Sequence, residues 1–182
     1  MRKLLIAAAG TALLCAAPAY AQETTPAEPT ATATFIDLEG NEVGTATLTQ
    51  AADGVTISGE VMGLEAGEHG FHIHAVGDCD PATMFESAGD HFNPDQKQHG
   101  MENPEGPHAG DMLNQTADDQ GTIMLDATNA MVSLTEGEPG YLFDDDGSAL
   151  MLHSDPDDYM TDPGGNSGDR VACAVIEAST TP

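Results

Sequence analysis

Short alternations of apolar and polar residues, separated by turn residues, recur along most of this 182-residue chain. Beyond the first thirty or so residues, no stretch of ten or more shows a clear 3.6-residue period. Alternation with a period of two is typical of strands that bury one face. The expected strands cover residues 33–37, 42–49, 54–62, 70–76, 112–117, 121–127, 148–152 and 170–177, with 130–134 as a possible short extra.

This pattern predicts an all-β fold, because many short strands with almost no helix pack as sandwiches or barrels. We expect an eight-stranded antiparallel Greek-key sandwich or flattened barrel. Two long segments, 77–110 and 153–169, interrupt the strands. Long loops inside a compact β domain usually carry function, so both are expected to be functional.

The first 21 residues have the pattern of a secretory signal peptide. A basic pair, Arg2 and Lys3, precedes an apolar run over 4–17, and a small-x-small site ends at Ala21. The run is too short for a membrane anchor. A lipoprotein with Cys15 as the acylated residue is disfavoured by the bulky residue before it. We therefore expect cleavage near Ala21 and a periplasmic or secreted protein.

The residues after the expected cleavage site form one domain and a short leader. Residues 22–32 are an acidic, Thr- and Pro-rich segment of low hydrophobicity, which is expected to be disordered. Residues 33–178 are long enough for a single domain with a proper core.

Two cysteines, Cys79 and Cys173, remain after cleavage. Because an exported chain meets an oxidising compartment, a long-range disulfide between them is the default interpretation. Two free thiols in a metal site are the alternative, which export disfavours. In the chain-entropy model a closed loop of about 95 residues stabilises the fold by roughly 4 to 5 kcal/mol.

The charge balance is extreme, with 31 acidic residues against four basic ones. Lys97 and Arg170 are the basic residues left after cleavage. Such a surface excludes nucleic acid and anionic membranes as partners. Solubility, or adaptation to a saline medium, explains the acidity better than a specific cationic partner does.

Five of the seven histidines and Asp111 lie between residues 70 and 111. His72 and His74 alternate with apolar residues, so both imidazoles point to one face of the expected strand. The other three histidines of this stretch, His91, His99 and His108, fall in a segment rich in Gly, Pro and Asn. The pattern indicates a strand and a loop that together carry metal ligands.

These ligands divide into two sets. His72, His74, His91 and His153 would give four nitrogen ligands, which suit copper. His91 or a neighbour, with His99, His108 and Asp111, would give three nitrogens and one oxygen, which suit a closed zinc site. Eight ligand positions and seven residues require one shared ligand, and His91 lies between the two sets in sequence.

Three motifs carry a resemblance to a known family. Residues 70–74 followed by Gly77, residues 165–173, and the spacing from His91 to Asp111 all resemble secreted copper/zinc superoxide dismutases, over roughly 33–177. The resemblance implies conversion of superoxide to O2 and H2O2 through alternating Cu²⁺ and Cu⁺, with one copper and one zinc per chain. It also allows a homodimer.

The resemblance implies a role for each matching residue. Copper is expected on His72, His74, His91 and His153, and zinc on His91, His99, His108 and Asp111, with His91 bridging the metals and carrying a proton. Asp157 falls at the carboxylate that links the two sites, with an ordinary loop acid as the alternative. Arg170 falls at the active-site arginine, with a structural ion pair as the alternative. Cys79 and Cys173 match the family disulfide.

A secreted metal-binding or copper-buffering protein is the other function considered. Storage needs neither a bridging histidine nor a cation that docks substrate, so His91 and Arg170 favour the enzyme. One departure from the family is the absence of lysine from 153–170, which leaves Lys97 as the one candidate helper for Arg170. We therefore expect long-range attraction of the anion to be lost and local focusing by Arg170, Lys97 and the metals to remain.

Overall fold

The structure is a computed structural model, and it describes residues 28–179. Within these residues it has nine strands and two short 3₁₀ helices, η1 (Pro81–Thr83) and η2 (Glu86–Ala88). The strands are β1 (Thr30–Asp37), β2 (Glu42–Ala51), β3 (Gly54–Val61), β4 (Gly67–His69), β5 (Phe71–His74), β6 (Gln115–Ala117), β7 (Ile123–Asn129), β8 (Ala149–His153) and β9 (Arg170–Ala178).

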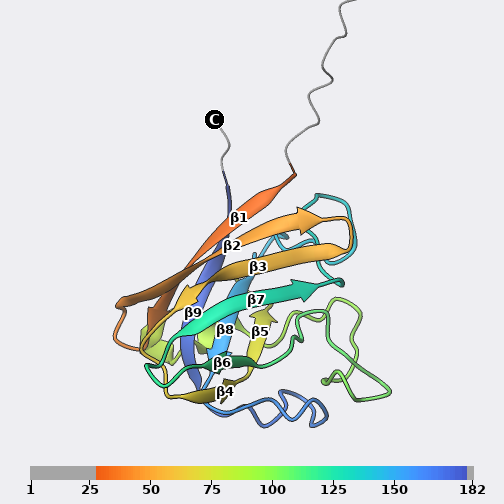
Figure 1. Cartoon of the computed structure of the whole chain (residues 1–182). Coiled ribbons are helices and arrows are strands. Elements are labelled where there is room, and N and C mark those ends of the chain that lie inside the picture. The colour runs from red at the N-terminus through yellow and green to blue at the C-terminus, as the bar shows by residue number, and fades with distance from the viewer. Residues whose placement is uncertain (1–27, 180–182) are drawn as a thin grey trace, which may run out of the picture.

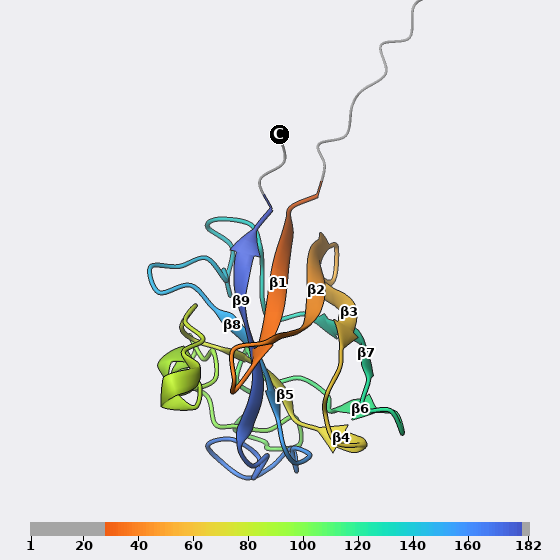
Figure 2. The same cartoon turned by 90° about the vertical axis from the view of Figure 1, so that its left-hand side faces the viewer.

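All strand pairs are antiparallel, and the strands form one sheet in the order β4-β6-β7-β3-β2-β1-β9-β8-β5. The end strands β4 and β5 are separated in the chain by Gly70 alone. The sheet therefore curls into a nearly closed barrel, which Figures 1 and 2 show from two sides. β3 lies beside β7, although β4, β5 and β6 intervene in sequence, and this is the expected Greek-key connection.

The barrel interior is filled by alternate side chains of the strands. In β1, for example, Ala31, Ala33 and Phe35 are buried, whereas the residues between them are exposed. β5 is different, because all four of its residues are buried. Phe71 and Ile73 belong to the barrel core, so the alternation puts His72 and His74 on the outer face, under the long loops.

The fold class is confirmed, but the strand count of eight is wrong by one. The additional strand is β4, which lies before the expected 70–76 strand. Gly70 separates β4 from β5, to which the expected strand is shortened. The possible extra strand at 130–134 is reduced to a single bridge between Ser133 and Tyr141. β1 begins at Thr30, so the last residues of the expected 22–32 leader belong to the barrel.

The expected disulfide between Cys79 and Cys173 is present, with a distance of 5.7 Å between the Cα atoms. It ties the first long loop to β9. Beside it, Phe85 and Ala88 from the 3₁₀ segment pack on Ala149 and Met151 of β8, and Figure 2 shows this yellow-green segment against the blue strands. The disulfide and this small cluster fix the 79–88 segment on the outside of the barrel.

The expected signal peptide, 1–21, and most of the leader lie outside the described residues. Between residues 28 and 179, no helix has the length and apolar character needed to cross a membrane.

Candidate metal centre

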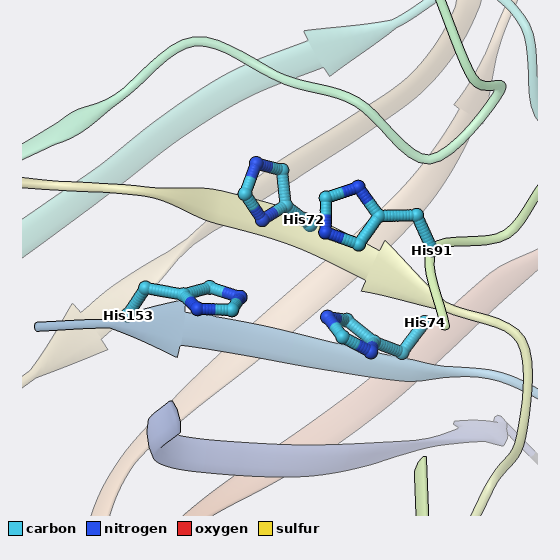
Figure 3. Close-up of side chains that lie close together, drawn as sticks. All are labelled: His72, His74, His91 and His153. Atoms are coloured by element: carbon cyan, nitrogen blue, oxygen red, sulfur yellow. The ribbon is translucent and has the colours of Figure 1, made fainter. Parts of the chain in front are cut away.

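Four histidines from three parts of the chain converge on one point outside the barrel wall. His72 and His74 come from β5, His153 ends β8, and His91 comes from the first long loop (Figure 3). One nitrogen of each lies within 4.8 Å of the others. The ring centroids of His72 and His91 are 4.0 Å apart, and those of His72 and His153 are 4.9 Å apart. We call these residues the four-histidine group.

Main-chain contacts bring the loop to this point. β5 pairs with β8 on one edge, and its other edge makes single bridges, His72 to Asp111 and His74 to His91. The N–H of Phe92 donates to the carbonyl of Ile73 at 2.8 Å, and the Ile73 N–H donates to Gly110 at 2.9 Å. The loop thus returns twice to the same strand and delivers one predicted ligand each time.

Each barrel histidine of this group has one ring nitrogen held by the protein. Nε2 of His72 lies 2.8 Å from Asp157, Nδ1 of His74 lies 2.8 Å from the Gly89 carbonyl, and Nδ1 of His153 lies 3.4 Å from the Gly168 carbonyl. The remaining nitrogens, Nδ1 of His72 and Nε2 of His74 and His153, are buried without a hydrogen-bond partner. Buried polar atoms are normally paired, so three lone pairs facing one point fit a metal ion.

The second cluster surrounds one oxygen of Asp111. Its Oδ1 lies 2.9 Å from His91 Nδ1, 3.0 Å from His99 Nδ1 and 3.4 Å from His108 Nδ1. A tetrahedral zinc ion with bonds of about 2.0 to 2.2 Å would separate its ligand atoms by about 3.4 Å. The spacing therefore fits the ligands of one small ion. We call His91, His99, His108 and Asp111 the Asp111 group.

The backbone fixes the orientation of Asp111. Its Oδ2 accepts hydrogen bonds from the N–H groups of Gly100 at 2.9 Å and His108 at 3.0 Å. This turns Oδ1 towards the three imidazoles. His91 belongs to both groups, because its Nδ1 faces Asp111 and its Nε2 is left for the four-histidine group.

Asp157 connects the two groups from the second long loop. One carboxylate oxygen lies 2.8 Å from His72 Nε2, and the other lies 3.0 Å from His99 Nε2. Asn114 holds the main chain of Asp157 on both sides, accepting from its N–H at 2.9 Å and donating to its carbonyl at 3.0 Å. The Tyr159 N–H also donates to Asp157 at 2.7 Å.

The contributions of Asn114 and Tyr159 were not predicted, because neither residue type is a usual ligand and neither has a diagnostic spacing. The same holds for Gly165, where a Cβ atom would lie 1.8 Å from Asp157 Oδ1. Only the contacts reveal these three supports of Asp157.

The pKa values separate the groups. Burial lowers the pKa of His91 to about 4 against the opposing bond to Asp111, and burial lowers that of His153 to about 2. Burial also lowers the pKa of His72 and, further, that of His74. Burial acts to lower the pKa of His99 too, but hydrogen bonds to Asp111 and Asp157 outweigh it and raise the value to about 9. The four-histidine group is thus neutral at pH 7 without metal.

Arg170 lies beside the four-histidine group. It shares with His74, His91 and His153 the lining of an open pocket that leads to solvent. Its Nη1 donates to the Phe85 carbonyl at 2.7 Å, and its side chain is 14% exposed. The pocket therefore contains a guanidinium next to imidazoles whose unpaired ring nitrogens could bind a metal ion.

Residues 42–176 match the family model described as copper/zinc superoxide dismutase (SODC). The chain belongs to the copper/zinc superoxide dismutase family. It is an oxidoreductase that acts on superoxide, and members of this family carry one copper and one zinc per chain.

The relatives agree with this family. The chain is 46% identical over 177 residues to "Superoxide dismutase [Cu-Zn] 2" of Aquifex aeolicus, which covers 97% of this chain and 99% of the relative. The crystal structure of a SOD-like protein from Bacillus subtilis matches with a TM-score of 0.75 and 37% identity, covering 79% of this chain and 95% of that one. Cu/Zn superoxide dismutase from Brucella abortus matches with a TM-score of 0.66 and 27% identity over 81% and 99%.

The structure of this superoxide dismutase brings together every residue predicted for the two metal sets, together with Asp157 and Arg170. His69 stays outside both groups. Its ring nitrogens face the carbonyls of His153 at 2.6 Å and Glu65 at 2.8 Å. It therefore supports the backbone of His153 from the barrel side.

Proposed function

We propose that the four-histidine group binds copper, that the Asp111 group binds zinc, and that His91 bridges the two ions. The observation that carries this assignment is the set of buried, unpaired nitrogens on His72, His74 and His153, which face the same point as His91. All-imidazole sites suit copper, whereas three nitrogens and a carboxylate suit a closed zinc site.

Copper would supply the redox chemistry, alternating between Cu²⁺ and Cu⁺ so that one superoxide is oxidised to O2 and a second is reduced to H2O2. The two half-reactions together consume two superoxide ions and two protons. Zinc has no redox chemistry and would have a structural part.

Arg170 would dock the superoxide anion. Its guanidinium lines the same pocket as His74, His91 and His153, and it is fixed by the Phe85 carbonyl. A fixed guanidinium binds a small anion without further ordering of the side chain. His91 would take up a proton at Nε2 in one half of the cycle and give it to the product in the other, while Nδ1 remains directed at Asp111.

Asp157 would orient both groups, because each of its oxygens contacts a histidine of a different group. Carboxylates of this kind hold the tautomer and the direction of metal-binding imidazoles.

We also propose that the chain is exported, to the periplasm or out of the cell, after cleavage near Ala21, on the basis of its basic pair, apolar run and small-x-small site.

Metal analysis combined with superoxide decay after pulse radiolysis tests the assignment. The purified protein should contain one copper and one zinc and accelerate the decay, whereas His153→Ala should lose copper and activity but keep zinc. If the wild-type protein holds both metals but superoxide decays no faster than in buffer, the chain is a metal-holding relative and Arg170 has another use.

A further inference from the structure

Glu86 lies beside the guanidinium that is proposed to dock superoxide. Its Oε2 is 3.8 Å from Arg170 Nη2, and both residues line the pocket above the four-histidine group. We propose that Glu86 acts as a built-in competitor at Arg170, so that its carboxylate sets how readily a small anion enters the site. This inference rests on the proposed docking role of Arg170.

The geometry favours competition over support. Arg170 Nη1 already donates to the Phe85 carbonyl at 2.7 Å, which is the length of a strong, charge-assisted bond. The contact to Glu86 is more than 1 Å longer by comparison, at 3.8 Å. Glu86 therefore adds little to the position of the guanidinium, but its negative charge still acts at this distance.

The exposures agree with this interpretation. The Glu86 side chain is 72% exposed, whereas that of Arg170 is 14% exposed. Glu86 can therefore swing into solvent when an anion arrives, at the cost of one weak surface ion pair. A competitor has to be displaceable in this way.

The other charged residues of the pocket indicate that Glu86 is the acidic residue that acts on Arg170. Arg170 is the sole lysine or arginine in the lining, which also contains four acidic residues: Glu86, Asp90, Asp162 and Asp169. Of these, Glu86 is the one that lies within ion-pair distance of the guanidinium in the described part of the chain. Its replacement should therefore act mainly through Arg170.

The first test measures anion binding without relying on turnover. Arg170 is the one arginine left after the proposed cleavage near Ala21, and Arg2→Lys removes the other arginine from any uncleaved chain, so one arginine Nε signal remains in nitrogen-15 NMR. The reduced holoenzyme, which is diamagnetic, is titrated with sodium chloride at constant ionic strength. Glu86→Gln should lower the chloride dissociation constant roughly two- to fivefold, the size of an exposed ion pair.

The matched control is Glu136→Gln, which removes one charge from an exposed glutamate outside the pocket lining. It should leave the dissociation constant unchanged. Equal effects of the two variants would overturn the inference, since net charge alone would then explain them. Weaker chloride binding in Glu86→Gln would also overturn it, because Glu86 would then be a support for Arg170.

The same titration separates this inference from the proposed function. If the Arg170 signal ignores chloride in every variant, the docking role of Arg170 itself fails. If it responds equally in the wild-type and Glu86→Gln proteins, only the competitor is lost. As a second readout, kcat/KM for superoxide at low salt should rise roughly two- to fivefold in Glu86→Gln and less in Glu136→Gln.

Discussion

The two metal-ligand groups share His91 but are built in different ways. In the four-histidine group, His72, His74 and His153 are strand residues of the barrel wall. In the Asp111 group, every member lies between β5 and β6, a segment that has the 3₁₀ helices but no strand. The barrel therefore preforms most of the first group, whereas the second depends on how the loop folds around Asp111.

The groups also differ in charge and access. The four-histidine group consists of imidazoles with lowered pKa values and opens to the Arg170 pocket. The Asp111 group is closed around a buried carboxylate whose pKa lies well below its usual range, because its hydrogen bonds, which include those to His91, His99 and the Gly100 N–H, outweigh burial. An open, neutral site suits substrate chemistry, and a closed, charged site suits structure.

Replacing the shared ligand should have the largest effect. His91→Ala removes one nitrogen from each group, so we expect activity at background and loss of zinc together with copper. His153→Ala removes a ligand from the four-histidine group alone and should retain zinc. Metal analysis of both variants checks this difference. Retention of zinc in His91→Ala at the wild-type level would mean that the two groups do not share a ligand.

Zinc binding to the metal-free protein should depend strongly on pH. The pKa of His99 is raised to about 9, so its ring is protonated in the folded protein between pH 7 and that value. Zinc must displace this proton. The apparent zinc affinity should therefore rise about tenfold for each pH unit up to the pKa.

Competition with a chelator at pH 7 and pH 8 measures this slope, and calorimetry in two buffers measures the released proton. In the four-histidine group, His72, His74 and His153 are already neutral in this range, so they should add no such slope to copper binding. A zinc affinity that is flat between pH 7 and pH 8 would contradict the charged character of the Asp111 group.

Asp157→Asn should weaken both groups together, by about 10- to 100-fold in metal affinity. His72 and His99 each direct a ring nitrogen at one oxygen of Asp157. An amide has one acceptor oxygen, so one imidazole loses its partner. Metal release to a chelator measures the effect. Asp155→Asn is the matched control in the same loop, because its carboxylate contacts Ser154 and neither metal group.

Gly165→Ala should produce a smaller version of the same defect, with metal release faster by about tenfold. The new Cβ would lie 1.8 Å from Asp157 Oδ1 and 2.7 Å from His99 Nε2, so Asp157 must move. Gly165 also has a φ of +64°, which disfavours a side chain.

Two controls separate these causes. Gly63→Ala places a methyl group at a φ of +83° with no atom within 4 Å, so it tests backbone strain alone. Gly164→Ala places its methyl group 3.7 Å from His91 Nε2, an ordinary contact. If either control releases metal as fast as Gly165→Ala, displacement of Asp157 is not the cause.

The same contrast explains how far the sequence alone could be used. His72 and His74 were predictable because strand alternation puts them on one face, and His153 because it ends an apolar strand. The loop members of the two groups were predictable only as a set, since spacing does not tell which nitrogen of His91 faces Asp111. Three-dimensional contacts decide that, as they decide the break at Gly70 that makes β4 a separate strand.

The residues that hold or influence the site from outside the two groups were harder still to predict from the sequence. Asn114 is bound to the main chain of Asp157, 43 residues away in sequence, and no local pattern indicates such a pair. Glu86 is one of many acidic residues, and only its distance from Arg170 distinguishes it. Sequence patterns reveal ligands because metals demand particular residue types. They do not reveal residues such as Asn114, which binds the main chain of a distant residue, or Glu86, which makes a single contact with a residue far away in sequence.

Salt should have the smallest effect, and its sign tests the contrast in access. In the described part of the chain, His74, His91 and His153 line the Arg170 pocket, whereas the Asp111 group reaches it through the shared His91. Superoxide must approach that pocket across the surface of a chain that has 31 acidic and four basic residues. Lys97 and Arg170 are the two cations beyond Lys3, so long-range attraction is expected to be absent and local focusing at Arg170 to remain.

At 0.15 M salt, charges are screened over about 8 Å. Repulsion of superoxide by distant carboxylates is then largely removed, whereas the attraction between superoxide and Arg170 at contact distance is nearly unaffected. Raising the salt concentration towards this value should therefore leave kcat/KM for superoxide flat or increase it, by less than about threefold. Pulse radiolysis across a salt series measures this dependence. The Lys97→Gln variant removes the one cation that remains besides Arg170 after the expected cleavage. A steep fall of the wild-type rate with salt would show that attraction from outside the pocket persists despite the acidic surface.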